Sequence, residues 1–236
     1  MYRPKVASVC ALILSLSFSS PAQEGGGAAF DKSRLPETGR AAADFVPAGW
    51  VLEEQVAGDL NNDAVPDLAL KLIQAKPANA KEDWIVERQR ALVVLFRGRD
   101  GALRRAAVAD KVLQCTSCGG AFYGVVEAPA GVKIERGVIV VSQDFGSREV
   151  TEHTYRFRYD AAAARFVLIG FDSTSRDRLT ATVTQESTNF LTGRKVTTVR
   201  TPPKTARGRD TVKTTTRAVA RKRTPMEEVD GENFYN

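Results

Sequence analysis

Residues 154–159 read Thr154-Tyr155-Arg156-Phe157-Arg158-Tyr159, and aromatic and basic side chains alternate through them. Successive side chains of a β-strand point to opposite faces of a sheet. This stretch therefore predicts a strand with its three aromatic rings on one face and its two arginines on the other. We expect the aromatic face to pack on a core and the basic face to contact water.

Short apolar runs recur along the chain before and after this stretch. They are rich in β-branched and aromatic residues and are bounded by Gly, Asp, Asn or Pro, which is typical of β-strands. The runs expected to form central strands are residues 68–73, 91–96, 138–141 and 166–169.

Turn residues separate the apolar runs. Asp100-Gly101, Arg136-Gly137 and Thr192-Gly193 favour tight hairpins, and residues 160–164 connect two of the expected strands. Connections this short leave no room for crossover helices, so neighbouring strands should pair antiparallel. The sequence therefore predicts an all-β fold, a single antiparallel meander domain over residues 44–200 that is open-barrel or sandwich-like and has short irregular insertions.

Two segments depart from this pattern. Residues 23–43 are rich in Gly, Ala and charge, which predicts a flexible leader, with order beginning near Phe45. Residues 75–89 form the longest irregular insertion and have room for one helical turn around Trp84.

A loop rich in aspartate, residues 59–67, comes directly before the apolar run 68–73. Asp59, Asn61, Asp63 and Asp67 occupy positions one, three, five and nine of this loop, and the carbonyl of Val65 occupies position seven. A hard cation needs several oxygen ligands that converge, and no His or Cys is near in the sequence. The spacing therefore predicts a site for Ca²⁺ rather than zinc.

The loop and the strand expected after it resemble the calcium loops of FG-GAP and VCBS repeats, which occur in integrin α-subunit propellers and in many exported bacterial proteins. The resemblance implies a structural calcium site. It covers about 25 residues in one copy, whereas a propeller needs four or more blades, so a full propeller is excluded. More widely, most of the chain looks like a group of exported bacterial proteins that carry one such loop, and this wider resemblance names no activity.

One position departs from the pattern of the family. Ala64 stands where these loops usually have Gly. That position favours a positive φ, and a residue with a Cβ atom there costs about 1 kcal/mol. A second interpretation of the loop stays open, because Asp and Asn also cap tight turns through their side chains without any metal.

The N-terminus has the features of a secretory signal peptide. Arg3 and Lys5 precede an apolar stretch over residues 6–18, and small residues lead to Ala22, after which we expect cleavage. The apolar stretch is shorter than the roughly 20 residues that span a bilayer, and no later segment comes closer. We therefore expect residues 1–22 to be removed and the mature protein to be soluble, without a membrane span, and periplasmic or secreted.

The remaining cysteines form a Cys115-Thr116-Ser117-Cys118 motif. Export places them in an oxidising compartment, so a disulfide is expected. A zinc site would need further Cys or His ligands, and a thioredoxin-like enzyme would need a helix after the motif. Gly119-Gly120 followed by residues 122–126 predicts a turn and then a strand instead.

The C-terminal segment, residues 201–236, is basic and poor in apolar residues. Its composition fits an exposed edge strand or a disordered tail about equally well. Its charge suits an acidic envelope polymer or an acidic protein partner. Aromatic residues are absent from it until Phe234, so it lacks the stacking platforms of nucleic-acid-binding proteins and we expect no nucleic acid partner.

No catalytic spacing stands out in the sequence. His153 is the only histidine, and a hydrolase built on it and Cys118 would need the sulfur that the disulfide occupies. We expect a non-enzymatic exported β domain that binds a partner or is associated with the envelope. Two alternatives are an inhibitor or immunity-type partner protein and an envelope-acting hydrolase that uses Glu53, Glu54 or Asp144.

Overall fold

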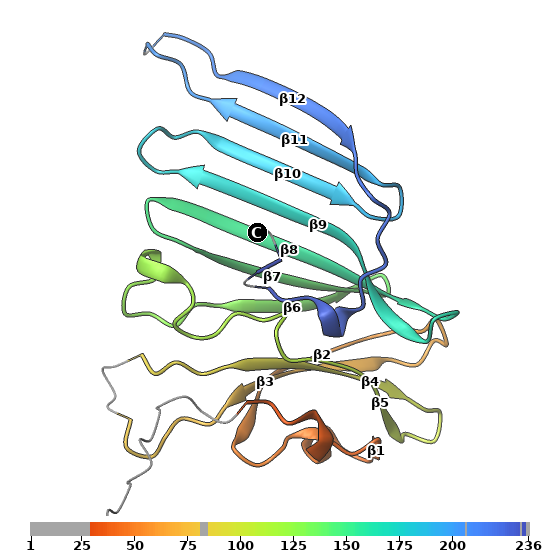
Figure 1. The fold of residues 1–236 in the computed structure, drawn as a ribbon. Helices are drawn as coiled ribbons and strands as arrows, with labels where there is room; N and C mark the ends of the chain where they lie inside the picture. Colours follow the sequence, from red (N-terminus) through yellow and green to blue (C-terminus); the bar gives the residue numbers. More distant parts are fainter. Residues whose placement is uncertain (1–28, 81–84, 206, 232, 235–236) are drawn as a thin grey trace, which may run out of the picture.

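The computed structural model describes residues 29–80, 85–205, 207–231 and 233–234. These residues form two antiparallel sheets in which strands follow one another in chain order, apart from the short first strand (Figure 1). The predicted all-β meander is confirmed, as two sheets of which neither closes into a barrel. The first sheet contains β1 (Thr38–Gly39), β2 (Trp50–Gly58), β3 (Asp67–Gln74), β4 (Arg90–Arg97) and β5 (Leu103–Ala109). The second contains β6 (Ala130–Glu135), β7 (Val138–Gly146), β8 (Glu149–Asp160), β9 (Arg165–Asp177), β10 (Val183–Asn189), β11 (Arg194–Thr201) and β12 (Thr211–Ala218).

The two central strands of the first sheet, β3 and β4, are buried on both faces. One face, which includes Ala69, Leu92 and Val94, packs against the second sheet, while the other belongs to a separate apolar cluster with Leu70 and Val93. A strand that is covered on both sides needs apolar residues at consecutive positions. This explains why residues 68–73 and 91–96 read as continuous apolar runs.

The outer face of the first sheet is covered by the chain that precedes β2. Phe30 packs edge-on against Trp50, with ring centroids 4.7 Å apart, and Leu35 and Phe45 are buried in the same cluster. The 3-10 helices η1 (Lys32–Arg34) and η2 (Ala42–Phe45) lie in this segment. Residues 29–43, which we expected to belong to a flexible leader, pack on the second apolar face of β3 and β4 in the structure. Residues 23–28 lie outside the described residues.

The second sheet packs its aromatic face on the first sheet. Tyr155, Phe157 and Phe166 are fully buried there, whereas Arg158 on the opposite face of β8 is exposed, as the alternation of residues 154–159 predicts. Strands β6 to β9 thus form one layer of a small sandwich, and β2 to β5 form the other.

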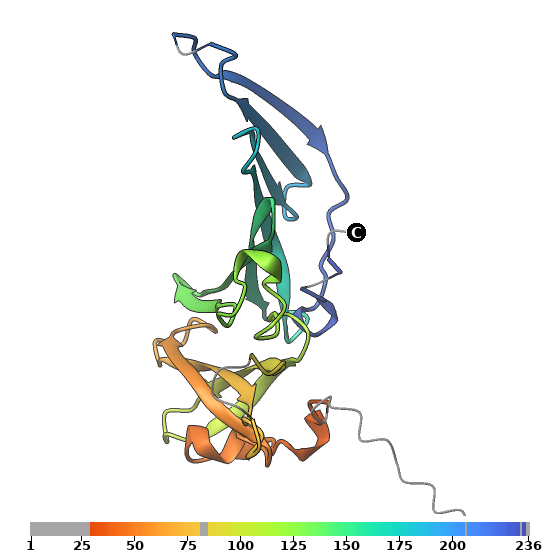
Figure 2. The same ribbon diagram turned by 90° about the vertical axis from the view of Figure 1, so that its left-hand side faces the viewer.

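The C-terminal chain returns to this core instead of ending at the sheet edge. After β12 it runs back along the molecule (Figures 1 and 2), and Thr224 and Pro225 pair with β9 at Leu168 and Val167. The 3-10 helix η4 (Met226–Glu228) then inserts Met226 into the core. Of the two alternatives left open for residues 201–236, the edge strand is present as β12, and the burial of Met226 and Val229 was not predicted.

Strands β10 to β12 extend the second sheet beyond the core. We call these three strands the wing. Every residue of β12 is exposed, and in β10 only Thr188 is buried. Figure 2 shows the wing as a single layer that rises above the two packed sheets.

One local prediction differs from the structure. Residues 122–126 do not form a strand: the 3-10 helix η3 (Gly120–Phe122) and irregular turns occupy this region. The helical turn expected around Trp84 lies outside the described residues.

In the part of the chain that the structure describes, no helix has the length and apolar character needed to cross a membrane.

Candidate functional site: the aspartate loop at the sheet junction

The aspartate loop connects β2 to β3 and lies where the two sheets meet. Gly58 at the end of β2 lies so close to Ile134 of β6 that a Cβ atom on Gly58 would approach the Ile134 side chain to 2.5 Å. On the other side, Gly137 in the β6–β7 turn faces the backbone carbonyl of Asp59. The loop is thus in contact with the second sheet although it belongs to the first.

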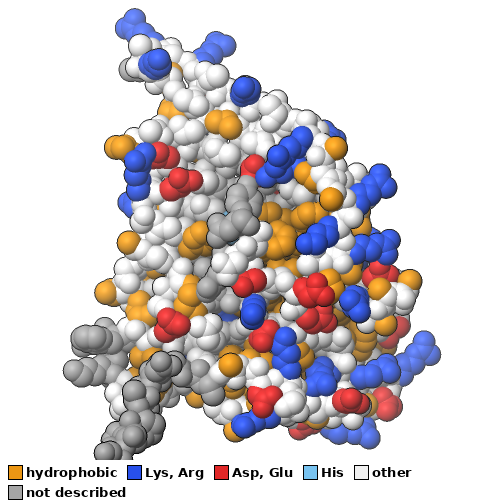
Figure 3. Space-filling model, viewed as in Figure 1, with side chains coloured by type: hydrophobic (Ala, Val, Ile, Leu, Met, Phe, Trp, Pro, Cys, Tyr) orange, Lys and Arg blue, Asp and Glu red, His pale blue; other side chains and the backbone are white. Residues whose placement is uncertain are grey.

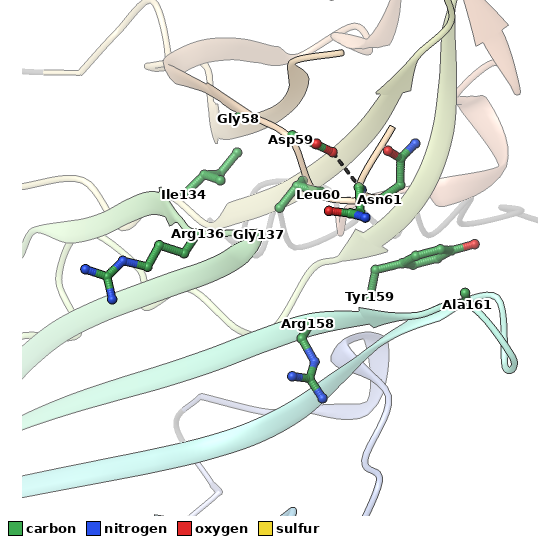
Figure 4. Close-up of a pocket in the computed structure, with 11 residues that line it drawn as sticks. Gly58, Asp59, Leu60, Asn61, Ile134, Arg136, Gly137, Arg158, Tyr159 and Ala161 are labelled. Carbon is green, nitrogen blue, oxygen red and sulfur yellow. Dashed lines mark hydrogen bonds between the residues drawn. The ribbon is translucent and has the colours of Figure 1, made fainter. Parts of the chain in front are cut away.

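Asp59 organises the backbone of the loop. Its Oδ1 accepts a hydrogen bond from the amide of Asn62 (2.7 Å, Figure 4) and one from the amide of Asp63 (3.2 Å). Its Oδ2 accepts one from the amide of Ala64 (2.9 Å). Asn61 and Asp63 bind further amides in the same way. Asn61 Oδ1 accepts from Asp63 N, and Asp63 Oδ1 accepts from Val65 N.

Asp67 is fully buried and ties the loop to two strands. Its Oδ2 accepts from the amide of Leu60 (2.9 Å), and its Oδ1 accepts from the amide of Arg97 in β4 (2.9 Å). Burial raises the pKa of Asp67 above its usual range, although the two amide hydrogen bonds act in the opposite direction. The charges of Asp63 and Asp59 raise the pKa further.

The loop backbone is left-handed at two positions. Asn62 has φ +65° and Ala64 has φ +66°. Asn tolerates this conformation, but an alanine there is strained by about 1 kcal/mol. The positive φ expected at position 64 is therefore present, and alanine occupies it.

The donor set suits a hard cation, while the observed arrangement is that of a hydrogen-bonded turn. Asp59, Asp63 and Asp67 carry three carboxylates, and none forms an ion pair among the described residues. Within those residues, no three acidic, histidine or cysteine side chains converge closely enough to form a ready metal cluster. Asp59 Oδ2 and Asp63 Oδ1 each accept one amide hydrogen bond, so each keeps a second lone pair that can bind a cation.

A groove of about 600 Å³ lies beside the loop. Asp59, Asn61 and Asn62 line one wall, and Arg136, Arg158 and Tyr159 line the other. In Figure 4 the side chains of Arg136 and Arg158 extend away from the Asp59 carboxylate. The groove could not be predicted from the sequence, because the pairing of β7 with β8 brings Arg136 and Arg158 close together, and the contact between the sheets places them beside the aspartate loop.

The predicted disulfide is present between Cys115 and Cys118. It closes a small loop at the start of the region that carries η3. Tyr123 in this region donates a hydrogen bond to Asp144 Oδ1 (2.6 Å), and burial together with this bond raises the pKa of Tyr123 to about 12.

The carboxylates considered for a hydrolase are each held by a partner. Glu53 accepts from Arg90 (2.8 Å and 3.1 Å), and Glu54 forms an ion pair with Lys71 (2.8 Å). Asp144 accepts a hydrogen bond from the hydroxyl of Tyr123. The three groups thus serve as structural ties between strands and loops.

His153 lies inside an aromatic cluster. Its ring is in edge contact with Phe145 and Phe171, and its Nδ1 lies 3.3 Å from the hydroxyl of Tyr155. Burial lowers the pKa of His153 to about 4, so the ring is neutral at physiological pH. This position is that of a core residue.

The buried charges at the sheet junction could not be predicted from the sequence. Lys71 Nζ donates to the carbonyl of Ala130 (2.8 Å), and Arg90 Nη1 donates to the carbonyls of Gln114 and Ala128 (3.0 Å each). Lys71, a lysine within the apolar run 68–73, is the feature of the sequence that points to them. The carbonyl to which Lys71 donates, that of Ala130, lies 59 residues later in the sequence, and the local pattern does not reveal this contact.

Comparison with known proteins finds no family model, no curated protein and no solved structure that matches the chain. The resemblance of residues 59–67 to FG-GAP and VCBS loops therefore remains a prediction from their sequence.

Proposed function

We propose that the protein is an exported, non-enzymatic binding domain in which residues 59–67 bind one calcium ion that braces the junction of the two sheets. The observation that carries the calcium proposal is the uncompensated charge of the loop. Three carboxylates lie within nine residues, one of them fully buried, and no basic side chain forms an ion pair with any of them among the described residues. A buried carboxylate without a counter-charge is costly.

A divalent cation would supply the missing charge. Asp59, Asn61, Asp63 and Asp67 would hold it through side-chain oxygens, with the carbonyl of Val65 as a fifth donor. The role is structural, since the loop links β2, β3 and β4 of the first sheet and contacts the β6–β7 turn of the second.

Thermal unfolding with and without calcium tests this proposal. Calcium at a hundred times its dissociation constant stabilises the folded state by about 2.7 kcal/mol, which corresponds to a rise of about 5 to 10 °C in Tm for a chain of this size. An Asp59→Ala, Asp63→Ala variant should lose this rise. Asp100→Ala is the matched control, because Asp100 also caps a turn through the amide of Ala102 but lies in the β4–β5 hairpin.

Two results would contradict the calcium site. One is the same midpoint with calcium and with a chelator, which would leave the loop as a capped turn. The other is a rise that the double variant retains, which would place the ion elsewhere.

The partner proposed for the domain is acidic. Residues 204–223, which include β12, carry several basic side chains without an ion pair among the described residues, and Asp210 is the single acidic residue in this stretch of sequence. The unpaired basic residues are Lys204, Arg207, Arg209, Lys213, Arg217, Arg221 and Lys222. Figure 3 shows lysine and arginine side chains at the upper tip of the wing, over the loop between β11 and β12.

Binding to a soluble polyanion such as polyglutamate tests the acidic partner. A Lys204→Gln, Arg207→Gln, Arg209→Gln variant should bind it about tenfold more weakly at low salt, and added salt should weaken binding of the parent protein. Unchanged binding in the triple variant would show that the wing tip is only a solvated surface.

A further inference from the structure

Exposed apolar side chains gather on one side of the second sheet, where the strands end and their connecting loops lie. Four of the eight large apolar side chains that are exposed in the described part of the chain lie there: Phe122 (43% exposed), Val125 (84%), Val126 (61%) and Leu179 (75%). Single exposed apolar residues are ordinary on a protein surface, whereas a group of them marks an interaction surface.

The register of the strands places three connections at this edge. Gly146 pairs with Val150 across the β7–β8 hairpin, Val183 pairs with both Arg176 and Arg200, and Thr201 pairs with Thr211. The connections 146–149, 178–182 and 202–210 therefore leave the sheet on the same side. We call this side, together with residues 119–127, the loop edge. It faces the viewer in Figure 2.

The loop that carries Phe122, Val125 and Val126 is firmly held. The Cys115–Cys118 disulfide precedes it, and the amide of Gly146 donates to the carbonyl of Gly119 (3.0 Å). Gly120 has φ +68°, and a Cβ atom on it would lie 2.7 Å from the carbonyl oxygen of Gly146. The fold thus fixes this loop against the β7–β8 hairpin while it leaves the valine side chains in solvent.

A second set of contacts joins the β9–β10 connection, which carries Leu179, to the same surface. The guanidinium of Arg178 lies 5.8 Å from the centroid of the Phe122 ring, and its backbone amide donates to the carbonyl of Arg148 (3.0 Å). Arg148 in turn forms an ion pair with Asp177 (2.6 Å). The apolar side chains therefore belong to one connected surface with arginines between them.

The charge of the loop edge is positive on balance. Its basic residues outnumber its acidic residues, and the three at the wing tip have no ion pair among the described residues. The basic residues are Arg148, Arg178, Lys204, Arg207 and Arg209, and the acidic ones, four in number, are Glu127, Glu149, Asp177 and Asp210. Apolar side chains next to cations suit the boundary between lipid headgroups and acyl chains, where valine and phenylalanine are buried and arginine binds phosphate.

We propose that the loop edge docks on an anionic membrane surface, with Val125, Val126 and Leu179 inserted below the headgroups and the wing-tip basic residues against the lipid phosphates. An acidic protein would use the charges but would leave the separate loop tips unburied, so the apolar residues favour the lipid surface. The inference rests on the proposed binding role and does not depend on the calcium loop.

Fluorescence quenching by lipids with brominated acyl chains tests the insertion. A Val125→Trp variant of the full chain is mixed with vesicles that contain one third anionic phosphatidylglycerol, and a Leu191→Trp variant is the matched control. Leu191 is also exposed but lies in the β10–β11 loop at the opposite edge. Both proteins contain the same residues 1–22, so any effect of that segment cancels in the comparison.

The expected result is stronger quenching in the Val125→Trp protein than in the parent chain, with no such increase in the Leu191→Trp protein. A Val125→Ser, Val126→Ser variant should bind the vesicles about tenfold more weakly, since each valine buries apolar surface on insertion. It should still bind soluble polyglutamate as the parent does, because it keeps the wing-tip charges.

Other results overturn the inference. Equal quenching at the two positions, or none, shows that the loop edge does not enter the membrane. If polyglutamate binding persists in that case, the proposed acidic partner survives and is a soluble one. Loss of both vesicle and polyglutamate binding in the double serine variant, with unchanged unfolding, would assign the valines to a protein-like contact instead.

Discussion

Replacement of Arg90 by methionine should show how strongly the buried charges hold the two sheets together. Arg90 is 3% exposed, and it donates to both oxygens of Glu53 and to the carbonyls of Gln114 and Ala128. Glu53 lies in β2 and the two carbonyls lie in the segment that leads into β6. One side chain therefore connects the first sheet to the start of the second.

The magnitude follows from the groups that lose a partner. Two buried carbonyls left without a donor cost about 1 kcal/mol each. Glu53 loses a bidentate partner but keeps Lys71 at 3.9 Å, and its side chain is 26% exposed, so its share is about 1 kcal/mol. The sum of about 3 kcal/mol corresponds to a fall of about 6 to 12 °C in Tm for a domain of this size.

Urea unfolding followed by tryptophan fluorescence measures this loss. Arg104→Met is the control, because Arg104 is exposed on the neighbouring strand β5 and should change stability by less than about 0.5 kcal/mol. A Glu53→Met, Arg90→Met double variant should recover part of the loss, with a coupling energy above about 1 kcal/mol. A loss below about 1 kcal/mol in Arg90→Met would refute the reasoning, since it would mean that water satisfies the two carbonyls.

Three further predictions follow from single residues. Ala64→Gly relieves the strain at φ +66° and should stabilise the protein by about 0.5 to 1 kcal/mol in urea unfolding, whereas Ala162→Gly, at a turn position without positive φ, should not. His153 takes up a proton near pH 6.5 in the unfolded chain but only near pH 4 in the folded chain. The free energy of unfolding should therefore fall by up to about 3 kcal/mol as the pH drops through this window. His153→Phe should remove this fall when unfolding is measured at a series of pH values. Tyr155→Phe leaves the carbonyl of Gly231 without its 3.0 Å donor and should cost about 1 to 2 kcal/mol, with faster proteolysis of the C-terminal segment as a second measurement.

The strands could be predicted from the sequence because their signals are local. The run 68–73 lies within β3, the alternation 154–159 lies within β8, and the turn at Arg136-Gly137 joins β6 to β7. The positive φ at position 64 could also be predicted, from the resemblance of the loop to known calcium loops.

The segments that cover the core could not be predicted, because their signals are single residues. Phe30 and Met226 are single large apolar residues among small, charged or turn-forming neighbours in the sequence, and each is buried by contacts with strands elsewhere in the chain. The buried state of Asp67 depends likewise on the amide of Arg97, 30 residues later. Propensity and periodicity carry no information about such pairings.

The wing has a consequence for how the molecule can change in size. A globular core must grow in volume when its surface grows, but a single-layer sheet gains surface one hairpin at a time. Each additional hairpin would extend the loop edge by about 10 Å, two strand spacings, and would require no new core residues. The loop edge can therefore lengthen without new core residues, provided that the chain between the last strand and Met226 lengthens enough to reach the core again.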